Sequence, residues 1–213
     1  MAYQLIIFDF DGTLADSADW VRRTINHVAD RYRFKRIADD EFALLRGRDN
    51  RAIIRHLGVP MWKMPFIANH MRALMSRDAD QIRLFSGASD LLRRLHAGGV
   101  TLAIVSSNTE DNIRRILGAE NAALISAYAC GASIFGKAAA FRRVLKRTGL
   151  PPAKTFCIGD ETRDIEAAAA LNLACGAVTW GYATADLLRA HGPTLVFDRI
   201  EDIGALLTAE PAL

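Results

Sequence analysis

Two carboxylates follow the first apolar run of the chain. Asp9 and Asp11 lie two residues apart in FDFDGTLADS (residues 8–17), directly after QLII. Two like charges at close range oppose each other's ionisation, and burial increases the cost. Gly12 lets the backbone turn tightly and leaves amide N–H groups free to bind an anion, beside the hydroxyl of Thr13. The stretch therefore indicates a site that holds a cation and an anion together.

Three later segments place further polar side chains after apolar runs or at the start of a helix-like stretch. They are Ser106, Ser107 and Asn108 after TLAIV, Lys137 after SIFG, and Gly159, Asp160, Glu161 and Asp164 in and after TFCIGD. Ligands bind at the carboxyl ends of the strands in an open parallel sheet, so we expect these segments to converge. Asp9 and Asp160, helped by Asp164, would form an oxygen-rich site suited to Mg²⁺. The metal and Lys137 would offset the carboxylate charge and favour a phosphate dianion beside them.

The elements that must position these residues follow from the apolar patterns. β-rich apolar runs occur at 4–10, 101–107, 155–160, 174–180 and 194–198, and amphipathic, helix-like stretches occur at 86–97, 109–118, 137–148, 162–171 and 184–191. Alternation of strands and helices predicts crossover connections and a parallel sheet covered on both faces. The nearly continuous hydrophobicity of the strands agrees with burial on both sides. We predict an α/β fold with an open, doubly wound parallel sheet and a Rossmann-like core.

Residues 15–83 interrupt this alternation. They contain helix-like patterns at 17–32, 39–46, 50–57 and 64–78, with no convincing strand between them. A connection of this length in a compact domain is usually a functional lid or an inserted subdomain. We therefore predict a core formed by residues 1–14 and 84–213, with a small all-α cap formed by residues 15–83.

Composition excludes several classes of protein. The chain has 213 residues, is 51% hydrophobic and carries a net charge of +3, without a Lys/Arg run of the kind that binds nucleic acid. No run of about 18 apolar residues is present, so we expect no membrane span. Cys130, Cys157 and Cys175 lack the paired spacing of a disulfide framework or a zinc site. MAYQLIIFDF lacks the features of a signal peptide, and we expect a cytoplasmic monomer or homodimer.

The quoted motifs resemble, in order, those of the haloacid dehalogenase superfamily of phosphohydrolases. The matching residues are DFDGTLADS, Ser106, Lys137 and GDETRD. The helical insertion resembles the first type of cap in that superfamily, as in phosphoglycolate phosphatases and β-phosphoglucomutases. TWGY at 179–182 is similar to the phosphoglycolate phosphatase branch. The resemblance implies a Mg²⁺-dependent phosphatase that acts on a small phosphorylated metabolite.

The resemblance also implies a role for each catalytic residue. Asp9 would attack phosphorus and form an aspartyl-phosphate. Asp11 would protonate the leaving oxygen and then activate water, while its backbone carbonyl ligates Mg²⁺. Ser106 and Lys137 would hold the phosphoryl oxygens.

The implied metal ligands are Asp9, Asp11 and Asp160, with support from Asp164. The other supporting residues are Gly12, Thr13, Ser107 and Glu161. Glu161 has two interpretations that stay open here: it lies beside the metal ligands, or it is an exposed partner of Arg163.

Other assignments also have alternatives. Related phosphatases often have proline after the motif lysine, whereas Ala138 follows Lys137, so Lys146 is the weaker alternative lysine. Ser106 could instead cap the helix that starts near Thr109, although Asn108 is the better candidate for that cap.

Substrate choice is expected to depend on the cap. In LLRGRDNRAII (44–54), Gly47 and Arg48 lie at a helix boundary. This region contacts the leaving group of the substrate in related proteins, so Arg48 is a candidate for binding a second anionic group. The alternative is an ordinary exposed arginine.

Two other functions compete with the phosphatase. A β-phosphoglucomutase-like isomerase would form the same aspartyl-phosphate and return the phosphoryl group to a sugar. A non-catalytic phosphate-binding or regulatory protein would be expected to lack the nucleophile or a metal ligand, but Asp9, Asp11, Lys137 and Asp160 are all present. A dehalogenase is disfavoured, because it would not use the acid/base that Asp11 supplies.

Overall fold

A six-stranded parallel sheet forms the centre of the computed structural model, which describes residues 3–131 and 136–207. Its order is β5-β4-β1-β6-β7-β8. The strands are β1 (Leu5–Phe8), β4 (Thr101–Val105), β5 (Ile125–Ala129), β6 (Thr155–Gly159), β7 (Ala174–Val178) and β8 (Leu195–Phe197). The chain runs from β1 outward through β4 to β5, and then crosses to β6 on the other side of β1. The prediction of an open, doubly wound parallel sheet is confirmed, and its switch point lies at β1.

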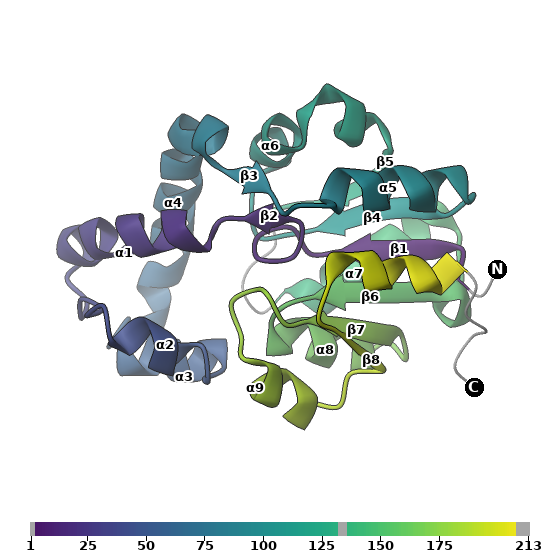
Figure 1. Cartoon of the computed structure of the whole chain (residues 1–213). Coiled ribbons are helices and arrows are strands. Elements are labelled where there is room, and N and C mark those ends of the chain that lie inside the picture. The colour runs from purple at the N-terminus through teal and green to yellow at the C-terminus, as the bar shows by residue number, and fades with distance from the viewer. Residues whose placement is uncertain (1–2, 132–135, 208–213) are drawn as a thin grey trace.

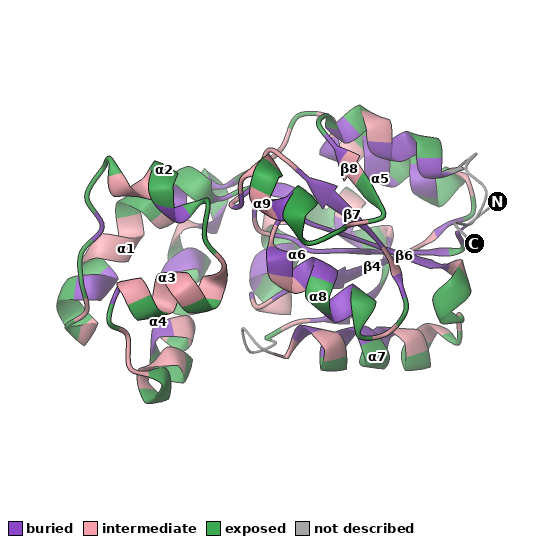
Figure 2. Cartoon of the chain, turned by 90° about the horizontal axis from the view of Figure 1, so that it is seen from below, coloured by how far each residue is buried: buried purple, intermediate pink, exposed green. Residues whose placement is uncertain are grey.

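Helices cover both faces of this sheet, with the buried strands between them (Figure 2). They are α5 (Ala88–Ala97), α6 (Glu110–Ala123), α7 (Lys137–Thr148), α8 (Thr162–Ala169) and α9 (Ala185–Ala190), with the short helices η3 (Pro152–Lys154) and η4 (Ile200–Leu207). Successive side chains of a strand point to opposite faces, and β1 shows the consequence. Ile6 and Phe8 pack in the cluster that includes α5, α6 and η4, whereas Leu5 and Ile7 pack in the cluster that includes α7, α8 and α9.

A separate group of helices lies to one side of the sheet (Figure 1). It consists of α1 (Ala18–Tyr32), α2 (Glu41–Leu45), α3 (Asn50–His56), η1 (Met61–Lys63), α4 (Met64–Asp78) and η2 (Ala79–Gln81). We call residues 18–81 the helical segment. Two short strands at its ends, β2 (Ala15–Asp16) and β3 (Arg83–Leu84), pair antiparallel, so the chain enters and leaves the segment side by side.

One strand of the sheet was not expected from the sequence. The edge strand β5 was missed, because ISAYA is rich in small residues and Ser126 is exposed, which leaves little of a strand's apolar pattern. The preceding helix was expected to end at residue 118, and its backbone does become non-helical at Gly118 (φ 74°), although a further helical stretch continues to Ala123. Among the described residues, no helix is long and apolar enough to cross a membrane.

Candidate active site

The polar residues predicted to converge do so at the carboxyl end of the sheet. Asp9 follows β1, Ser106 follows the neighbouring strand β4, and Asp160 follows β6 on the other side. Lys137 is the first residue of α7, and its Nζ lies 2.6 Å from Asp9 Oδ2. The weaker alternative, Lys146, is exposed in the last turn of the same helix, about 14 Å further along its axis. The structure therefore brings Lys137 to the site and leaves Lys146 outside it.

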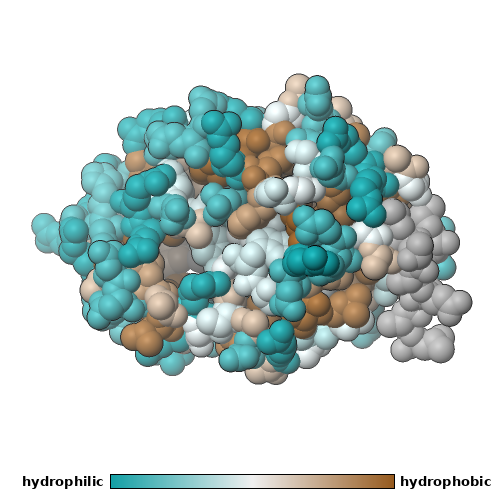
Figure 3. Space-filling view, viewed as in Figure 1, coloured by the Kyte–Doolittle hydropathy of each residue, from teal (hydrophilic) through white to brown (hydrophobic). Residues whose placement is uncertain are grey.

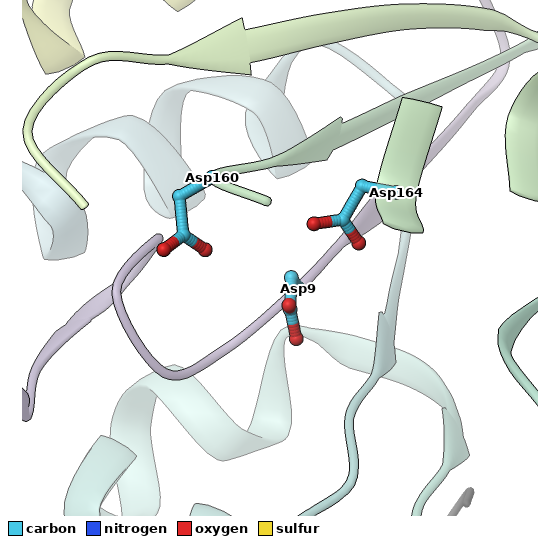
Figure 4. Close-up of side chains that lie close together, drawn as sticks. All are labelled: Asp9, Asp160 and Asp164. Carbon is cyan, nitrogen blue, oxygen red and sulfur yellow. The ribbon is translucent and has the colours of Figure 1, made fainter. Parts of the chain in front are cut away.

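Three buried carboxylates form the centre of the site. Oxygen atoms of Asp9, Asp160 and Asp164 lie within 4.8 Å of one another, and all three residues are buried. Figure 4 shows the three side chains around a shared space. Burial raises the pKa of Asp160 well above its usual range, and the negative charges of Glu161, Asp9 and Asp164 raise it further. Such a cluster of oxygen donors with unbalanced charge fits a hard divalent cation such as Mg²⁺.

The carboxylate of Asp160 is held from two sides. The Thr13 hydroxyl donates to Oδ1 at 2.8 Å, and the Tyr182 amide donates to Oδ2 at 2.7 Å. Gly12, whose φ is +79°, and Gly181 pack so closely that a Cβ on either would collide with this carboxylate. The turn at Gly12 therefore places Thr13 beside Asp160. From the sequence we predicted a turn near the site, but not this contact between Thr13 and Asp160.

Lys137 bridges two of the acids. Its ammonium group forms ion pairs with Asp9 and Asp164, and its side chain is almost entirely buried. Burial alone would lower the pKa of Lys137, but the charges of Asp164 and Asp9 outweigh it, and the pKa is raised. Asp164 has its pKa raised to about 6, chiefly by burial and against the opposing effect of Lys137. The lysine is thus a fixed positive charge beside Asp9.

Asp11 lies next to the cluster and accepts a hydrogen bond from the Asn108 side chain. Burial and the charge of Asp9 raise the pKa of Asp11 to about 6, although hydrogen bonds from Ser17 and Asn108 lower it. A carboxyl group with its pKa in this range can carry a proton near neutral pH, as a general acid must. Asp9 and Asp11 therefore occupy different environments despite being two residues apart.

Asn108 belongs to the group of polar residues that was expected to converge after β4, and it was also the better of two candidates for the cap of α6. Thr109 is the N-cap and accepts the Asn112 amide at 3.3 Å. The Asn108 side chain turns instead toward the site, where Nδ2 donates to Asp11 Oδ2 at 3.2 Å. The Ser106 hydroxyl accepts the Asn108 amide at 3.1 Å, which ties the two residues together. The available signal was the position of Asn108 at the carboxyl end of a strand.

Glu161 is the partner of Arg163. It is the N-cap of α8, where its amide donates to Asp164 Oδ2 at 3.1 Å, and its side chain forms an ion pair with Arg163. Arg163 in turn has Nη2 3.9 Å from Asp9 Oδ2, so a second cation lies near the Asp9 carboxylate. In one of the two interpretations from the sequence Glu161 was an exposed partner of Arg163, whereas both side chains are mostly buried.

The helical segment contacts the same end of the sheet at two places. Arg72 of α4 donates to the Ser107 carbonyl at 2.9 Å, and its own carbonyl accepts the Asn112 side chain at 3.0 Å. Arg46, directly after α2, donates to the Gly181 carbonyl at 2.9 Å. The surface is hollowed between the helical segment and the rest of the molecule (Figure 3). Arg48, the predicted substrate-binding residue, is exposed, and its role stays a prediction.

Comparisons with known proteins agree with this site. The family model for haloacid dehalogenase-like hydrolases matches residues 6–178. The phosphoglycolate phosphatase of Synechococcus elongatus is 34% identical over 201 residues, which cover 94% of this chain and 95% of the relative. The tyrosine-protein kinase PtkA of Mycobacterium bovis is 29% identical, over 91% of this chain and 68% of its own length. A solved haloacid dehalogenase-like hydrolase from Streptococcus pneumoniae has a TM-score of 0.78 at 18% identity, covering 96% of this chain and 98% of the other.

The match spans the whole catalytic end of the sheet, from β1 to β7. The four motif positions predicted from the sequence, Asp9, Ser106, Lys137 and Asp160, all lie within it. The chain therefore belongs to the haloacid dehalogenase-like hydrolase family, as a phosphatase that resembles phosphoglycolate phosphatase.

Proposed function

We propose that the protein is a Mg²⁺-dependent phosphatase that hydrolyses a small phosphomonoester through an aspartyl-phosphate on Asp9. The observation that supports this most is the position of the Asp9 carboxylate. It is buried at the end of the central strand, belongs to the acidic cluster, and has its Oδ2 2.6 Å from the ammonium of Lys137. A nucleophilic carboxylate needs both a metal and a fixed cation beside it, because it must approach a phosphate dianion.

The proposed metal ligands are side-chain oxygens of Asp9 and Asp160 and the backbone carbonyl of Asp11, with Asp164 in support. The three clustered carboxylates give the donor set that Mg²⁺ favours. When bound, Mg²⁺ would neutralise part of their charge and polarise the phosphoryl group.

The chain's own residues would carry out two transfers. In the first, an oxygen of Asp9 attacks phosphorus, the bond from phosphorus to the ester oxygen breaks, and the Asp11 carboxyl gives its proton to that oxygen. In the second, the Asp11 carboxylate takes a proton from water, the water oxygen attacks phosphorus, the bond from phosphorus to the Asp9 oxygen breaks, and inorganic phosphate leaves. Asp9 is then a carboxylate again and Asp11 is protonated again. The raised pKa of Asp11, about 6, suits a group that must both give and take a proton.

Positive charge and hydrogen-bond donors would hold the phosphoryl group during both steps. Lys137 would bind a phosphoryl oxygen through Nζ, and Ser106 would donate its hydroxyl to another. The backbone amides of Gly12 and Thr13, expected from the sequence to be free to bind an anion, instead donate within the turn to the Ala15 carbonyl at 2.9 Å and the Phe10 carbonyl at 3.2 Å. We also propose that residues 15–83 act as a cap over the site and that Arg48 binds a second anionic group of the substrate.

The acceptor of the phosphoryl group is the point on which related functions differ. A phosphatase transfers it to water, a mutase returns it to a sugar, and the relative PtkA is named as a tyrosine kinase. The assembled set of Asp9, Asp11, Lys137 and Asp160 disfavours a non-catalytic protein on this scaffold. Water is the proposed acceptor here.

The test is a panel of phosphorylated metabolites assayed for inorganic phosphate in the presence of Mg²⁺. Wild-type protein should release phosphate steadily from at least one small ester. Asp9→Asn should reduce the rate to no more than a few per cent while leaving the melting temperature close to that of the wild type. As a matched pair, Lys137→Met should be severely impaired and Lys146→Met should not. Substantial phosphatase activity in Asp9→Asn, or transfer to an added sugar or tyrosine peptide without phosphate release, would contradict the proposal.

A further inference from the structure

Arg46 joins the helical segment to a loop of the sheet domain, residues 181–184. Its Nη2 donates to the Gly181 carbonyl at 2.9 Å, and its Nε donates to the Tyr182 carbonyl at 3.2 Å. Its own backbone carbonyl accepts the Thr184 amide at 2.9 Å. A guanidinium group suits this task, because its rigid fork can donate to two neighbouring carbonyl oxygens at once.

The opposite side of the same loop holds Asp160. The Tyr182 amide donates to Asp160 Oδ2 at 2.7 Å, and the Ala183 amide donates to the Asp160 carbonyl at 3.3 Å. Gly181 packs so tightly against the Asp160 side chain that a Cβ there would collide with it. Displacement of the loop would therefore remove one of the two hydrogen bonds that orient this carboxylate.

The loop also contacts the surroundings of Asp11. The Tyr182 hydroxyl lies 2.8 Å from the Ser17 hydroxyl, and Ser17 in turn lowers the pKa of Asp11. Tyr182 thus connects to one acid through its backbone amide and to the other through its phenol group. Residues 181–184 thus connect Arg46 to Asp160 and, through the Tyr182 hydroxyl, to Ser17.

We propose that Arg46 is a positioning residue: it holds residues 181–184 against Asp160, so that the binding strength of the metal site depends on contact between the helical segment and the sheet. The proposal rests on the proposed function only in taking Asp160 as a metal ligand. Arg46 acts through the loop and need not touch the substrate. The residue two positions along, Arg48, was the sequence-based candidate for substrate contact and has a different proposed role.

The first test is hydrogen exchange of the Tyr182 amide in the metal-free protein, followed by NMR. Removal of two hydrogen bonds from a charged donor should free the loop to open, so Arg46→Met should accelerate this exchange by about tenfold or more. Arg46→Lys can donate to one carbonyl and should give an intermediate rate. The matched control is Arg23→Met, which removes an exposed arginine of α1. Amides of β4 report whether the sheet itself is intact in each variant.

The second test is Mg²⁺ binding measured by calorimetry on the same variants. Arg46→Met should weaken Mg²⁺ affinity by about tenfold, and Arg23→Met should leave it unchanged. Unchanged exchange at Tyr182 in Arg46→Met would overturn the proposal. A higher KM with unchanged Mg²⁺ affinity would also overturn it, because it would identify Arg46 as a substrate contact.

The two proposals can fail separately. If the wild type releases no phosphate from any ester but Tyr182 exchange still depends on Arg46, the proposed function fails and the positioning role stands. If the wild type is an active phosphatase and Arg46→Met matches Arg23→Met in both exchange and Mg²⁺ affinity, the positioning role fails alone. If Arg46→Met also accelerates exchange of the β4 amides, Arg46→Lys is the deciding variant. If the sheet of Arg46→Lys is intact and its Tyr182 amide exchanges no faster than in the wild type, the positioning role is contradicted.

Discussion

Asn108 Nδ2 lies 3.2 Å from Asp11 Oδ2, although the two residues are 97 positions apart in the chain. The orientation of the Asn108 amide is fixed from its other end. Its Oδ1 accepts the Thr109 amide at 2.9 Å and the Asn112 side chain at 3.0 Å, which leaves Nδ2 to face Asp11. The loop after β4 therefore positions the proposed general acid as well as supplying Ser106.

Asn108→Ala should impair proton transfer more than phosphoryl binding. Loss of the amide donor removes a hydrogen bond that lowers the pKa of Asp11 and frees the carboxyl to rotate. We expect kcat to fall by about tenfold for an alkyl phosphate, whose leaving oxygen needs a proton, and by less for a nitrophenyl phosphate. Asn121→Ala, in α6 and outside the site, is the control. An equal loss of kcat for both esters would show that Asn108 stabilises the fold and does not assist proton transfer by Asp11.

Removal of metal should stop turnover. Chelation by EDTA should abolish phosphate release, and Mg²⁺ should restore it. Ca²⁺ should restore it poorly, because Ca²⁺ takes more ligands at longer distances and would draw carboxylates into bidentate binding. The measurement is the initial rate after dialysis and addition of each ion. Full activity in excess chelator would refute the metal site.

The helical segment should lose stability at acid pH through Glu41. Hydrogen bonds from the Ala38 amide, Lys35 and His56 lower the pKa of Glu41 from 4.5 to about 2. Since the folded-state pKa lies below the unfolded one, the stabilisation is complete above pH 4.5 and is lost as the pH falls toward 2. Glu41→Gln should therefore melt below the wild type at pH 7, and the difference should shrink between pH 4.5 and pH 2. Melting curves at several pH values check this, and a pH-independent difference would contradict it.

The central part of the site was predictable because its charged residues stand directly after the apolar runs that form the strands. Asp9 and Asp160 follow buried strands at positions where no core residue would be charged, so the polar residues stand out in the sequence. Because β1 pairs in parallel with both β4 and β6, the carboxyl ends of these three strands lie side by side. Lys137 could be placed because it starts a helix immediately before one of these strands.

The residues that were missed depend on contacts between distant segments. Arg46 contacts Gly181 and Tyr182, which lie 135 and 136 positions later in the chain. Nothing in the local sequence shows that Arg46 makes these contacts and that Arg48 does not. Arg163 has the pattern of a surface residue until α8 is packed against β6 and β7. β5 lies at the edge of the sheet and is built of small residues, so its hydrophobic pattern is weak. The local periodicity of apolar residues predicts helices and strands, but it does not predict which loops contact one another.

The central claim is that Asp9 accepts the phosphoryl group and Asp11 moves the proton. Asp11→Asn keeps Asp9, Asp160 and the backbone carbonyl at position 11, so Mg²⁺ should still bind and Asp9 can still be phosphorylated. The variant loses proton transfer, which is typically worth about 10²–10⁴-fold in rate. Attack by water on the aspartyl-phosphate should therefore be slow, and the intermediate should accumulate.

The most direct measurement is single-turnover phosphorylation of Asp11→Asn, stopped in acid and mapped by mass spectrometry of peptides. With a nitrophenyl phosphate, whose leaving group needs little protonation, a phosphoryl group should appear on Asp9 at a rate close to that of the wild type. With an alkyl phosphate, phosphorylation of Asp9 should be slowed by the full value of the lost proton transfer, about 10²–10⁴-fold. Absence of a phosphoryl group on Asp9, or an equal loss of rate with both esters, would contradict the roles assigned to these two neighbouring acids.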